Sequence, residues 1–383
     1  MSRTIVIAGT ALLGALLLAS LSYGRPAPAR GNVGASACSS GSVSARIGGR
    51  LRCLRAGQRC RKRYDQQYRR HGFHCRAGRL ERSLPSAGKV VATIRLHTGP
   101  MGAVFADDTL WVAEHNAGTV ARIDPGTNKV TARVPIPSGQ PARFASGPEG
   151  LWHLPYSDNT LQELDPATNR VSAHITDLGV EDDNCCVPAV GAGSVWVPKG
   201  VDGLYRVDAS THRVVAHVPI DHFFGTAFAF GSLWGITGGD VFRLDPATNS
   251  IGVRIPVPGL ARVNTFSDIA PAIGVASGAV WVGVGKKIVR IDPSSNSVVA
   301  TIPVPGTAEF IASTDEGVWV VGSSPSYTTT LWRIDPTANK VSAALSLSPS
   351  SAGDVVAAAG SLWITLFRMN KLLRVQPAPS AAG

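Results

Sequence analysis

The chain has 383 residues, with 37 Lys and Arg against 26 Asp and Glu, and a formal net charge of +11. Hydrophobic residues make up 44% and charged residues only 16%, which excludes a disordered chain and leaves enough apolar side chains for a large core. The 41 Gly and 26 Pro favour many short strands joined by turns over long helices. We therefore expect an all-β fold.

Residues 1–24 have the order of a secretory signal peptide. Arg3 precedes an apolar run from Ile5 to Leu21, and small residues follow as candidate cleavage sites. An uncleaved membrane anchor is the alternative, because the run is near the lower length limit for a span. The sequence holds no second long apolar stretch, so we expect no transmembrane segment after cleavage, and a secreted, extracellular or cell-envelope location. Residues 25–45 predict a flexible linker rich in Pro, Ala, Gly and Ser.

The positive charge is concentrated in residues 46–82, which hold 13 Lys and Arg against two acids, while the remainder of the chain is close to neutral. Four of the six cysteines, Cys38, Cys53, Cys60 and Cys75, lie in or beside this segment. In an exported chain such a cluster predicts disulfides among its own members, although three pairings remain open. A segment this short has too little core without cross-links. We expect a small, basic, disulfide-rich module.

Within this module Cys60, Tyr64 and Tyr68 share one helical face, which predicts a helix from Gln58 to Arg70. The basic residues, together with Tyr64, Tyr68 and Phe73, suggest that residues 46–82 bind a polyanion such as a wall polymer or a nucleic acid. A solvated appendage without a partner is the alternative. A zinc site is a further alternative, and its ligands would be Cys53, Cys60, His71, His74 and Cys75.

The remaining sequence is an array of repeats. A Trp flanked by apolar residues recurs every 38 to 47 residues, at Trp111, Trp152, Trp196, Trp234, Trp281, Trp319 and Trp363. A second motif has its third position 11 to 16 residues after each Trp: RIDP at Arg122, ELDP at Glu163, RVDA at Arg206, RLDP at Arg243, RIDP at Arg290, RIDP at Arg333 and RVQP at Arg374. Four strands per repeat of about 43 residues is typical of a β-propeller blade.

Turn residues and small residues support this prediction. Asp-Pro begins a tight turn, and an Asn three to four residues later tolerates the left-handed conformation, at Asn128, Asn169, Asn249, Asn296 and Asn339. Small side chains precede each Trp, as expected where several strands crowd toward one axis. The seventh repeat stops at Pro377 without its fourth strand, and a matching strand stands alone at Gly88–Leu96. We expect that strand to close a seven-bladed propeller spanning residues 86–377, followed by a disordered tail at 378–383. An open solenoid is the alternative.

The repeat LWVAEHNAGTVARIDPGTNKVTARVPI resembles the YVTN and NHL-type propellers, and the array is similar to the virginiamycin B lyase family. In that family a metal-assisted elimination opens a cyclic lactone, and acids three residues after the blade Trp contribute to the site. Glu114 is the residue that matches this position here. The segment RIGGRLRCLRAGQRCRKRYDQQYRRHGFHCRAGRL also resembles a short module near the N-terminus of exported actinobacterial proteins.

Candidate site residues fall in the loops that would converge on one propeller face. The longest loops between blades are Asp177–Pro188 and Pro258–Ala272, and such loops on a rigid ring usually carry binding. The candidate binding residues are Asn116, Asp158, Asn159, Lys199, Asp221, His222, Arg262 and Asn264. No catalytic residue is assigned; the weak candidates for an acid or base are Glu114 and His115.

The loop DLGVEDDNCCVP offers two further hypotheses. Glu181, Asp182 and Asp183 are hard oxygen ligands that could hold Ca²⁺ or Mg²⁺, with a solvated acidic loop as the alternative. Cys185 and Cys186 could form a strained adjacent disulfide, stay reduced, or bridge to the N-terminal module.

Three functions remain open from the sequence. The first is an exported, monomeric, non-catalytic propeller that binds a small molecule, an envelope polymer or a protein through its loop face. The second is a metal-assisted lyase or hydrolase of the virginiamycin B lyase type. The third is a structural wall protein held by the basic module. Sparse charge in the loops and a single family-like acid, Glu114, favour the first function over the second.

Overall fold

The computed structural model describes residues 38–39, 41–137, 140–156, 158–179, 187–200, 202–220, 223, 225–260, 272–314, 317–323 and 328–379. The chain divides into two compact units, Met1–Ser83 and Leu84–Gly383. Within the described ranges, no helix combines the length and apolar character needed to cross a membrane. The predicted signal peptide lies outside the described residues.

The first unit is a small α+β module. Its elements are β1 (Val43–Ile47), β2 (Arg50–Leu54), η1 (Lys62–Tyr64), α1 (Asp65–Arg69), β3 (Phe73–Arg76) and β4 (Arg79–Arg82). Disulfides join Cys38 to Cys53 and Cys60 to Cys75, which confirms that these four cysteines pair among themselves. The buried core is Ala45, Ile47, Leu54, Tyr68, Phe73 and Leu80.

Two expectations for this module are wrong. The helical segment does not begin at Gln58, because Gln58 and Cys60 make backbone hydrogen bonds to Leu80 and Gly78 and so extend the β3–β4 hairpin. The zinc alternative also fails, because the thiols of Cys53, Cys60 and Cys75 are consumed by disulfides. The three residues predicted to share one face do meet the same core, since Tyr68 is part of it and Cys60 and Tyr64 pack against it.

The second unit contains seven antiparallel four-stranded sheets. Blades 1 to 3 are β6 (Pro100–Ala106), β7 (Thr109–Glu114), β8 (Thr119–Asp124), β9 (Lys129–Pro135); β10 (Pro141–Gly147), β11 (Gly150–Pro155), β12 (Leu161–Asp165), β13 (Arg170–Ile175); β14 (Ala189–Gly191), β15 (Ser194–Lys199), β16 (Gly203–Asp208), β17 (Arg213–Val218). Blades 4 and 5 are β18 (Gly225–Ala229), β19 (Ser232–Ile236), β20 (Asp240–Asp245), β21 (Ser250–Pro256); β22 (Ile273–Ala276), β23 (Ala279–Val284), β24 (Lys287–Asp292), β25 (Ser297–Pro303). Blades 6 and 7 are β26 (Thr307–Thr314), β27 (Gly317–Ser323), β28 (Thr329–Asp335), β29 (Lys340–Ser348); β30 (Ala352–Ala358), β31 (Ser361–Leu366), β32 (Lys371–Pro377), β5 (Gly88–Arg95).

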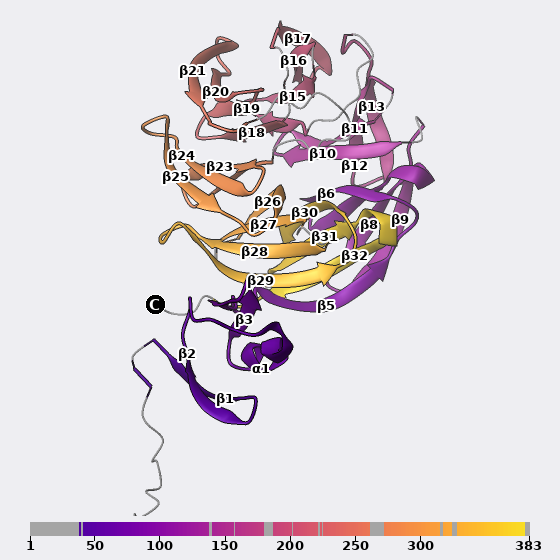
Figure 1. The fold of residues 1–383 in the computed structure, drawn as a ribbon. Helices are drawn as coiled ribbons and strands as arrows, with labels where there is room; N and C mark the ends of the chain where they lie inside the picture. The colour runs from indigo at the N-terminus through magenta and orange to yellow at the C-terminus, as the bar shows by residue number, and fades with distance from the viewer. Residues whose placement is uncertain are drawn as a thin grey trace, which may run out of the picture. The chain divides into compact units, whose positions relative to one another are not determined.

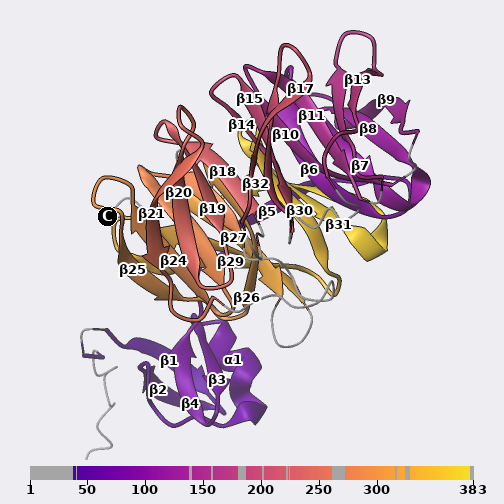
Figure 2. The same ribbon diagram turned by 90° about the horizontal axis from the view of Figure 1, so that it is seen from above.

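The seven-bladed prediction is confirmed, including its closure. The first strand of each blade contacts the first strand of the next, and β30 contacts β6, so the blades form a closed ring (Figure 1, Figure 2). The order β30-β31-β32-β5 shows that the N-terminal strand completes blade 7, with Gly88 opposite Pro377. Just before β5, Ala87 donates to the carbonyl of Ala344 in blade 6, and Ala344 donates to that of Pro85.

The first strand of each blade, called the inner strand below, contacts the first strands of the neighbouring blades. The space between these strands admits only small side chains at several positions. A Cβ atom on Gly102 would lie 2.1 Å from the carbonyl oxygen of Ala142 in the next blade. On Gly191 it would lie 2.2 Å from the Phe228 ring. Neither contact is tolerable, so these positions hold glycine for lack of space.

The turns that close each blade follow the predicted chemistry. The Asp side chain of six repeats accepts a backbone N–H two residues later, at Asp124, Asp165, Asp208, Asp245, Asp292 and Asp335. The five predicted Asn residues all have positive φ, between 48° and 59°. These turns present a carbonyl and an amide side chain to the preceding blade.

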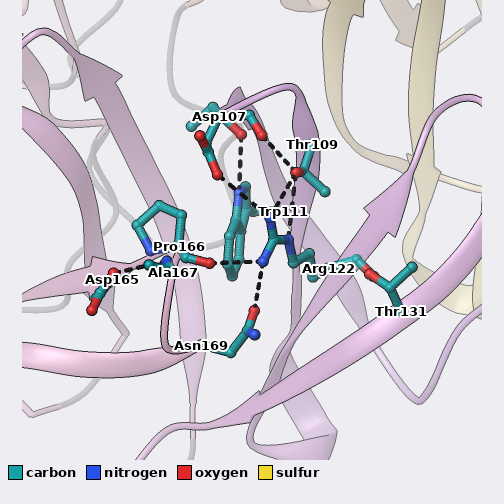
Figure 3. A network of polar contacts seen from close by, with 10 residues as sticks. Asp107, Thr109, Trp111, Arg122, Thr131, Asp165, Pro166, Ala167 and Asn169 are labelled. Carbon is teal, nitrogen blue, oxygen red and sulfur yellow. Dashed lines mark hydrogen bonds and ion pairs between the residues drawn. The ribbon is translucent and has the colours of Figure 1, made fainter.

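An arginine crosses six of the seven seams. At five of them it meets that turn, and at the sixth Arg333 donates to the Ala378 carbonyl. Figure 3 shows the seam from blade 1 to blade 2. Arg122 lies over the buried Trp111 ring, with its Cζ 5.2 Å from the ring centroid. Its Nη1 donates to the Pro166 carbonyl at 2.7 Å and to Asn169 Oδ1 at 3.1 Å. Six blades carry the same cation–π contact, at 4.8 to 5.5 Å. The Arg-on-Trp contact with its bonds across the seam is called the seam staple below.

Blade 2 is the exception, because Glu163 replaces the arginine. Its Oε2 lies 3.3 Å from His212 Nε2, and His212 occupies the turn position of blade 3 that is Asn in blades 1, 2, 4, 5 and 6. The His212 ring also meets Trp152 edge-on at 5.7 Å. A Glu–His pair therefore replaces an Arg–Asn pair at this one seam, and both partners differ together.

The last staple closes the ring, because Arg374 in blade 7 donates to the Pro125 carbonyl and to Asn128 in blade 1. We predict that Arg374→Gln destabilises the propeller by about 2 kcal/mol, since it removes a cation–π contact and two bonds between blades. Thermal unfolding measures this. The control is Arg95→Gln, an exposed arginine in the same blade. Equal melting temperatures for the two variants would contradict the role of the staple in closure.

Candidate functional site

One face of the ring gathers polar side chains around the axis. The first strand of each blade begins where the second strand ends, as the pairing of Pro141 with Pro155 shows. Four inner strands carry a bulge at this end, in blades 1, 2, 6 and 7. A bulge redirects side chains at the edge of a sheet. This end of the axis, with the bulged strands β6, β10, β26 and β30, is called the mouth.

The bulge at the start of β10 links three blades. The Pro141 carbonyl lies 3.0 Å from His115 Nδ1 in blade 1. The Ala142 N–H donates to Nε2 of the buried His153 at 3.3 Å. Arg143 donates to the Gly353 carbonyl of blade 7 at 3.3 Å. Three consecutive residues thus connect the polar groups of blades 7, 1 and 2.

Charged groups of both signs lie on the inner strands of the mouth. Arg143 is half-buried, and its guanidinium lies 5.9 Å from the Phe310 ring centroid. Asp354 accepts the N–H groups of Ala103 and Val355 at 3.0 and 2.8 Å. Burial raises the pKa of Asp354, against the opposing effect of Arg143 and these two N–H groups. The Arg143 cation therefore lies beside the Asp354 carboxyl group, whose charged form is disfavoured by burial.

Glu309 is a second acid at the mouth, on the bulge of β26. It is buried, and its Oε1 accepts a hydrogen bond from the Ser323 hydroxyl. Burial raises the pKa of Glu309, against the hydrogen bonds from Ser323. A carboxyl held in such a place is more easily protonated than an exposed one.

Aromatic side chains from blades 7, 1 and 2 lie next to the same end of the axis. His115 is in η2 (His115–Ala117), and its ring meets Tyr156 edge-on at 5.4 Å. Phe367, in η3 (Phe367–Met369), lies 6.3 Å from the His115 ring. These three rings give the mouth an apolar rim beside its charged groups.

Behind the rim, a buried polar cluster joins blades 2 and 3. Lys199 is fully buried, and its Nζ donates to Asn159 Oδ1. Asp158 accepts from the backbone and hydroxyl of Thr160 at 3.1 and 2.7 Å, and from Gln162 Nε2 at 3.4 Å. Burial lowers the pKa of the neighbouring His153 to about 4, against the opposing effects of Gln162 and Asp158. His153 is therefore neutral at physiological pH.

Glu114 is engaged from every side. It is fully buried and accepts Thr119 Oγ1 at 2.6 Å, the His97 N–H at 2.7 Å and Arg133 Nε at 2.9 Å. Burial raises its pKa, but the hydrogen bonds from Arg133, Thr119 and His97 outweigh that effect, so the pKa of Glu114 is lowered. The carboxylate holds the end of β7 to β8 and β9, which is a structural role.

The structure places the sequence candidates in three groups. Asp158, Asn159 and Lys199 come together, as described above. Asn116 is exposed in η2, and its backbone N–H bonds to the Thr98 carbonyl. The remaining predictions lie outside the described residues: Glu181, Asp182, Asp183, Cys185, Cys186, Asp221, His222, Arg262 and Asn264.

Sequence reasoning missed the polar residues of the inner strands. Arg143, Glu309 and Asp354 each interrupt a run of small or apolar residues next to the bulge of a first strand. His153 directly follows a blade Trp, where the other blades have Val, Gly or Ile. A polar residue that breaks the repeat is thus the pattern that marks these four positions, three of them on inner strands and His153 on the second strand, β11.

A hollow lies between blades 1 and 2, on the face of the ring opposite the mouth. It has a volume of about 570 Å³, and its lining includes Asp107, Gly150, Glu163 and Asp165. One of these residues, Glu163, is where blade 2 departs from the other six blades, which have Arg. The altered seam of blade 2 therefore contributes to this hollow.

The fold and the mouth define a seven-bladed β-propeller. No family model matches the sequence, and no curated protein matches it. Among solved structures, virginiamycin B lyase from Staphylococcus aureus matches with a TM-score of 0.60 at 14% identity, covering 75% of this chain and 99% of that one. Hydrazine synthase from Kuenenia stuttgartiensis matches with a TM-score of 0.61 at 14% identity, covering 75% of this chain and 98% of that one. At this identity the likeness shows the shared propeller fold alone.

The described residues contain no group of three His, Cys, Asp or Glu side chains placed to hold a metal ion. The predicted ligands Glu181, Asp182 and Asp183 are not among them. The Ca²⁺ or Mg²⁺ hypothesis therefore stays a prediction.

We predict that Glu114→Gln lowers the free energy of unfolding by about 2 kcal/mol at neutral pH, because it breaks a buried ion pair. Since the folded pKa of Glu114 is lowered, its stabilisation is complete above the ordinary value of 4.5 and is lost as the pH falls through the folded value. The difference between wild type and variant must shrink in acid. Denaturant titrations at several pH values measure this, with Asp108→Asn, an exposed acid, as the control.

His153 gives a prediction with a different pH range. The unfolded chain takes up a proton near pH 6.5 and the folded chain only near pH 4, so His153 destabilises the fold progressively as the pH falls between these values. The shift corresponds to about 3 kcal/mol. We expect His153→Gln to lose less stability than wild type between pH 7 and pH 4. The control is His174→Gln at an exposed position, whose stability should change with pH as that of wild type does. If the stability of His153→Gln changed with pH in the same way as that of this control, the effect would not come from His153.

Proposed function

We propose that this protein is a non-catalytic binding propeller that takes a small organic molecule at the mouth. The observation that carries the proposal is the half-buried Arg143, held between Gly353 and Phe310 at the open end of the axis. Its guanidinium retains donors for an oxygen-bearing ligand. The rings of His115, Tyr156 and Phe367 supply apolar surface for the rest of that ligand.

Further parts of the proposal follow from the sequence. The protein is exported, is monomeric and remains outside the cell or at the envelope. Residues 46–82 contact a polyanion. Two disulfides in the N-terminal unit support export, because disulfides persist in oxidising compartments.

The alternative function is a metal-assisted lyase, supported by the fold likeness to virginiamycin B lyase. Glu114 has both carboxylate oxygens engaged, so a lyase would need acids other than the one that matches that family's blade position. Divalent-metal-dependent opening of a cyclic lactone by the full chain would favour this alternative over binding alone.

The test is a thermal-shift screen of the full chain against small organic acids, sugars and aromatic compounds, followed by calorimetry on any molecule that raises the melting temperature. We expect Arg143→Ala to weaken binding by about tenfold or more, because a charge-assisted bond is lost. Arg170→Ala removes an exposed arginine from an outer strand and should bind as wild type does.

Equal binding by the two variants would exclude the mouth as the site. In the same assays, a ligand that binds wild type and is consumed would exclude a non-catalytic role.

A further inference from the structure

Three arginines of the N-terminal module lie in one row across its small sheet. Arg76 in β3 is directly opposite Arg79 in β4. Arg59 pairs with Arg79 on the other side in an isolated bridge, supported by the backbone bonds from Cys60 to Gly78 and from Leu80 to Gln58. Directly opposed residues have side chains on the same face, about 5 Å apart at Cβ. Arg59, Arg79 and Arg76 are called the arginine row.

The row brings three like charges together beside a single acid. Opposed like charges destabilise a sheet. Glu81 is the carboxylate near the row, and it lies 3.1 Å from His74 Nε2 and 3.8 Å from Arg76 Nη1. The module's other acid is Asp65, on α1. Its carboxylate accepts hydrogen bonds from Arg69 Nε and from the backbone N–H of Cys75. Arg79 Nη1 also donates to the Gly57 carbonyl at 2.9 Å. Three exposed arginines thus share one nearby acid, and an external anion would relieve their repulsion.

The basic residues around the row are also directed to solvent. All 13 Lys and Arg of residues 46–82 are exposed, and 12 of them are arginine. The guanidinium group presents a planar fork of donors that suits phosphate oxygens. The whole module can therefore follow the backbone of a linear phosphate polymer.

The aromatic side chains of the module are buried or half-buried. Tyr68 and Phe73 are buried in the module core, and Tyr64 packs against it with Arg63 over its ring at 4.9 Å. The expectation that Tyr68 and Phe73 contribute to a binding face is therefore wrong, and the half-buried Tyr64 ring is covered on one side by Arg63. Proteins that bind single-stranded nucleic acid stack its bases on exposed aromatic rings, and this module offers none among its described residues.

We infer that the arginine row binds a phosphodiester polymer through its backbone alone, without contact to bases. The inference rests on the proposed polyanion contact of residues 46–82 and names its chemical class. The partner is a base-free phosphodiester chain, which the module recognises by the spacing and number of its phosphates. Binding of this kind depends strongly on salt, because each neutralised phosphate releases counterions.

The experiment compares two probes of equal length and charge on the full oxidised chain. One probe is an abasic deoxyribose-phosphate oligomer, and the other is an oligothymidylate. We expect equal affinities within about threefold, and an affinity that falls steeply with salt. Oligothymidylate binding about tenfold tighter would overturn the inference, because the bases would then contribute. Failure of both probes to bind at low salt would overturn the polyanion contact itself.

The variants locate the site. The triple change Arg59→Ser, Arg76→Ser and Arg79→Ser should weaken binding by about tenfold or more and make the salt dependence shallower by about two counterions. The matched control removes three exposed arginines of the propeller, Arg95→Ser, Arg170→Ser and Arg213→Ser, so the net charge changes equally.

A third variant guards against misfolding. The corresponding three Arg→Lys changes keep the charge and should keep most of the affinity, and both disulfides are checked by mass spectrometry in every variant. Unchanged binding by the Ser variant, or an equal loss in the propeller control, would overturn the assignment to the row.

Discussion

The ring depends on the seam staple, in which a buried tryptophan carries an arginine that binds the turn of the following blade. Arg122 is an example: its guanidinium lies over the Trp111 ring and donates hydrogen bonds to the Pro166 carbonyl and to Asn169 Oδ1. The apolar clusters also lie between neighbouring blades, as where Trp111 of blade 1 and Leu151 of blade 2 share one cluster, but apolar contacts have no fixed direction. Directional hydrogen bonds across the seam fix the spacing and order of the blades. Because the contacts run from each blade to the next, six arginine staples and the Glu163–His212 pair together close the ring.

Blade 2 shows how strictly the seam constrains the sequence. A glutamate in place of arginine would leave the next turn without a donor if that turn had kept its asparagine. His212 instead supplies a group that can pair with Glu163 and contact Trp152. The hollow beside this seam and the polar cluster of Lys199 both involve blade 2 or blade 3. Departures from the repeat therefore concentrate where this propeller is least regular, and that is where individual function is expected in a repeat fold.

Much of the fold follows from local sequence. The spacing of the tryptophans, the Asp-Pro turns and the solitary strand at Gly88 predict the blades and their closure, because these features act over a few residues or repeat regularly. The site follows less directly. Arg143 and Asp354 are 211 positions apart and become neighbours only when seven blades complete a circle. The motif that singles out Glu114 likewise does not predict its contacts, since Arg133 and Thr119 bind its carboxylate and neither belongs to that motif.

The joint between β5 and β32 has a mechanical consequence. Gly88 is opposite Pro377, so the chain enters and leaves blade 7 at the same end of this strand pair. A pull on the N-terminal unit would therefore open the pair one bond after another from that end, rather than load all of its bonds at once. The hydrogen bonds that tie Pro85 and Ala87 to Ala344 stand in front of this weak end and take the force first. If the basic module is held by a polymer under flow, that short clamp on blade 6, rather than the strand pair, sets the tension that the propeller withstands.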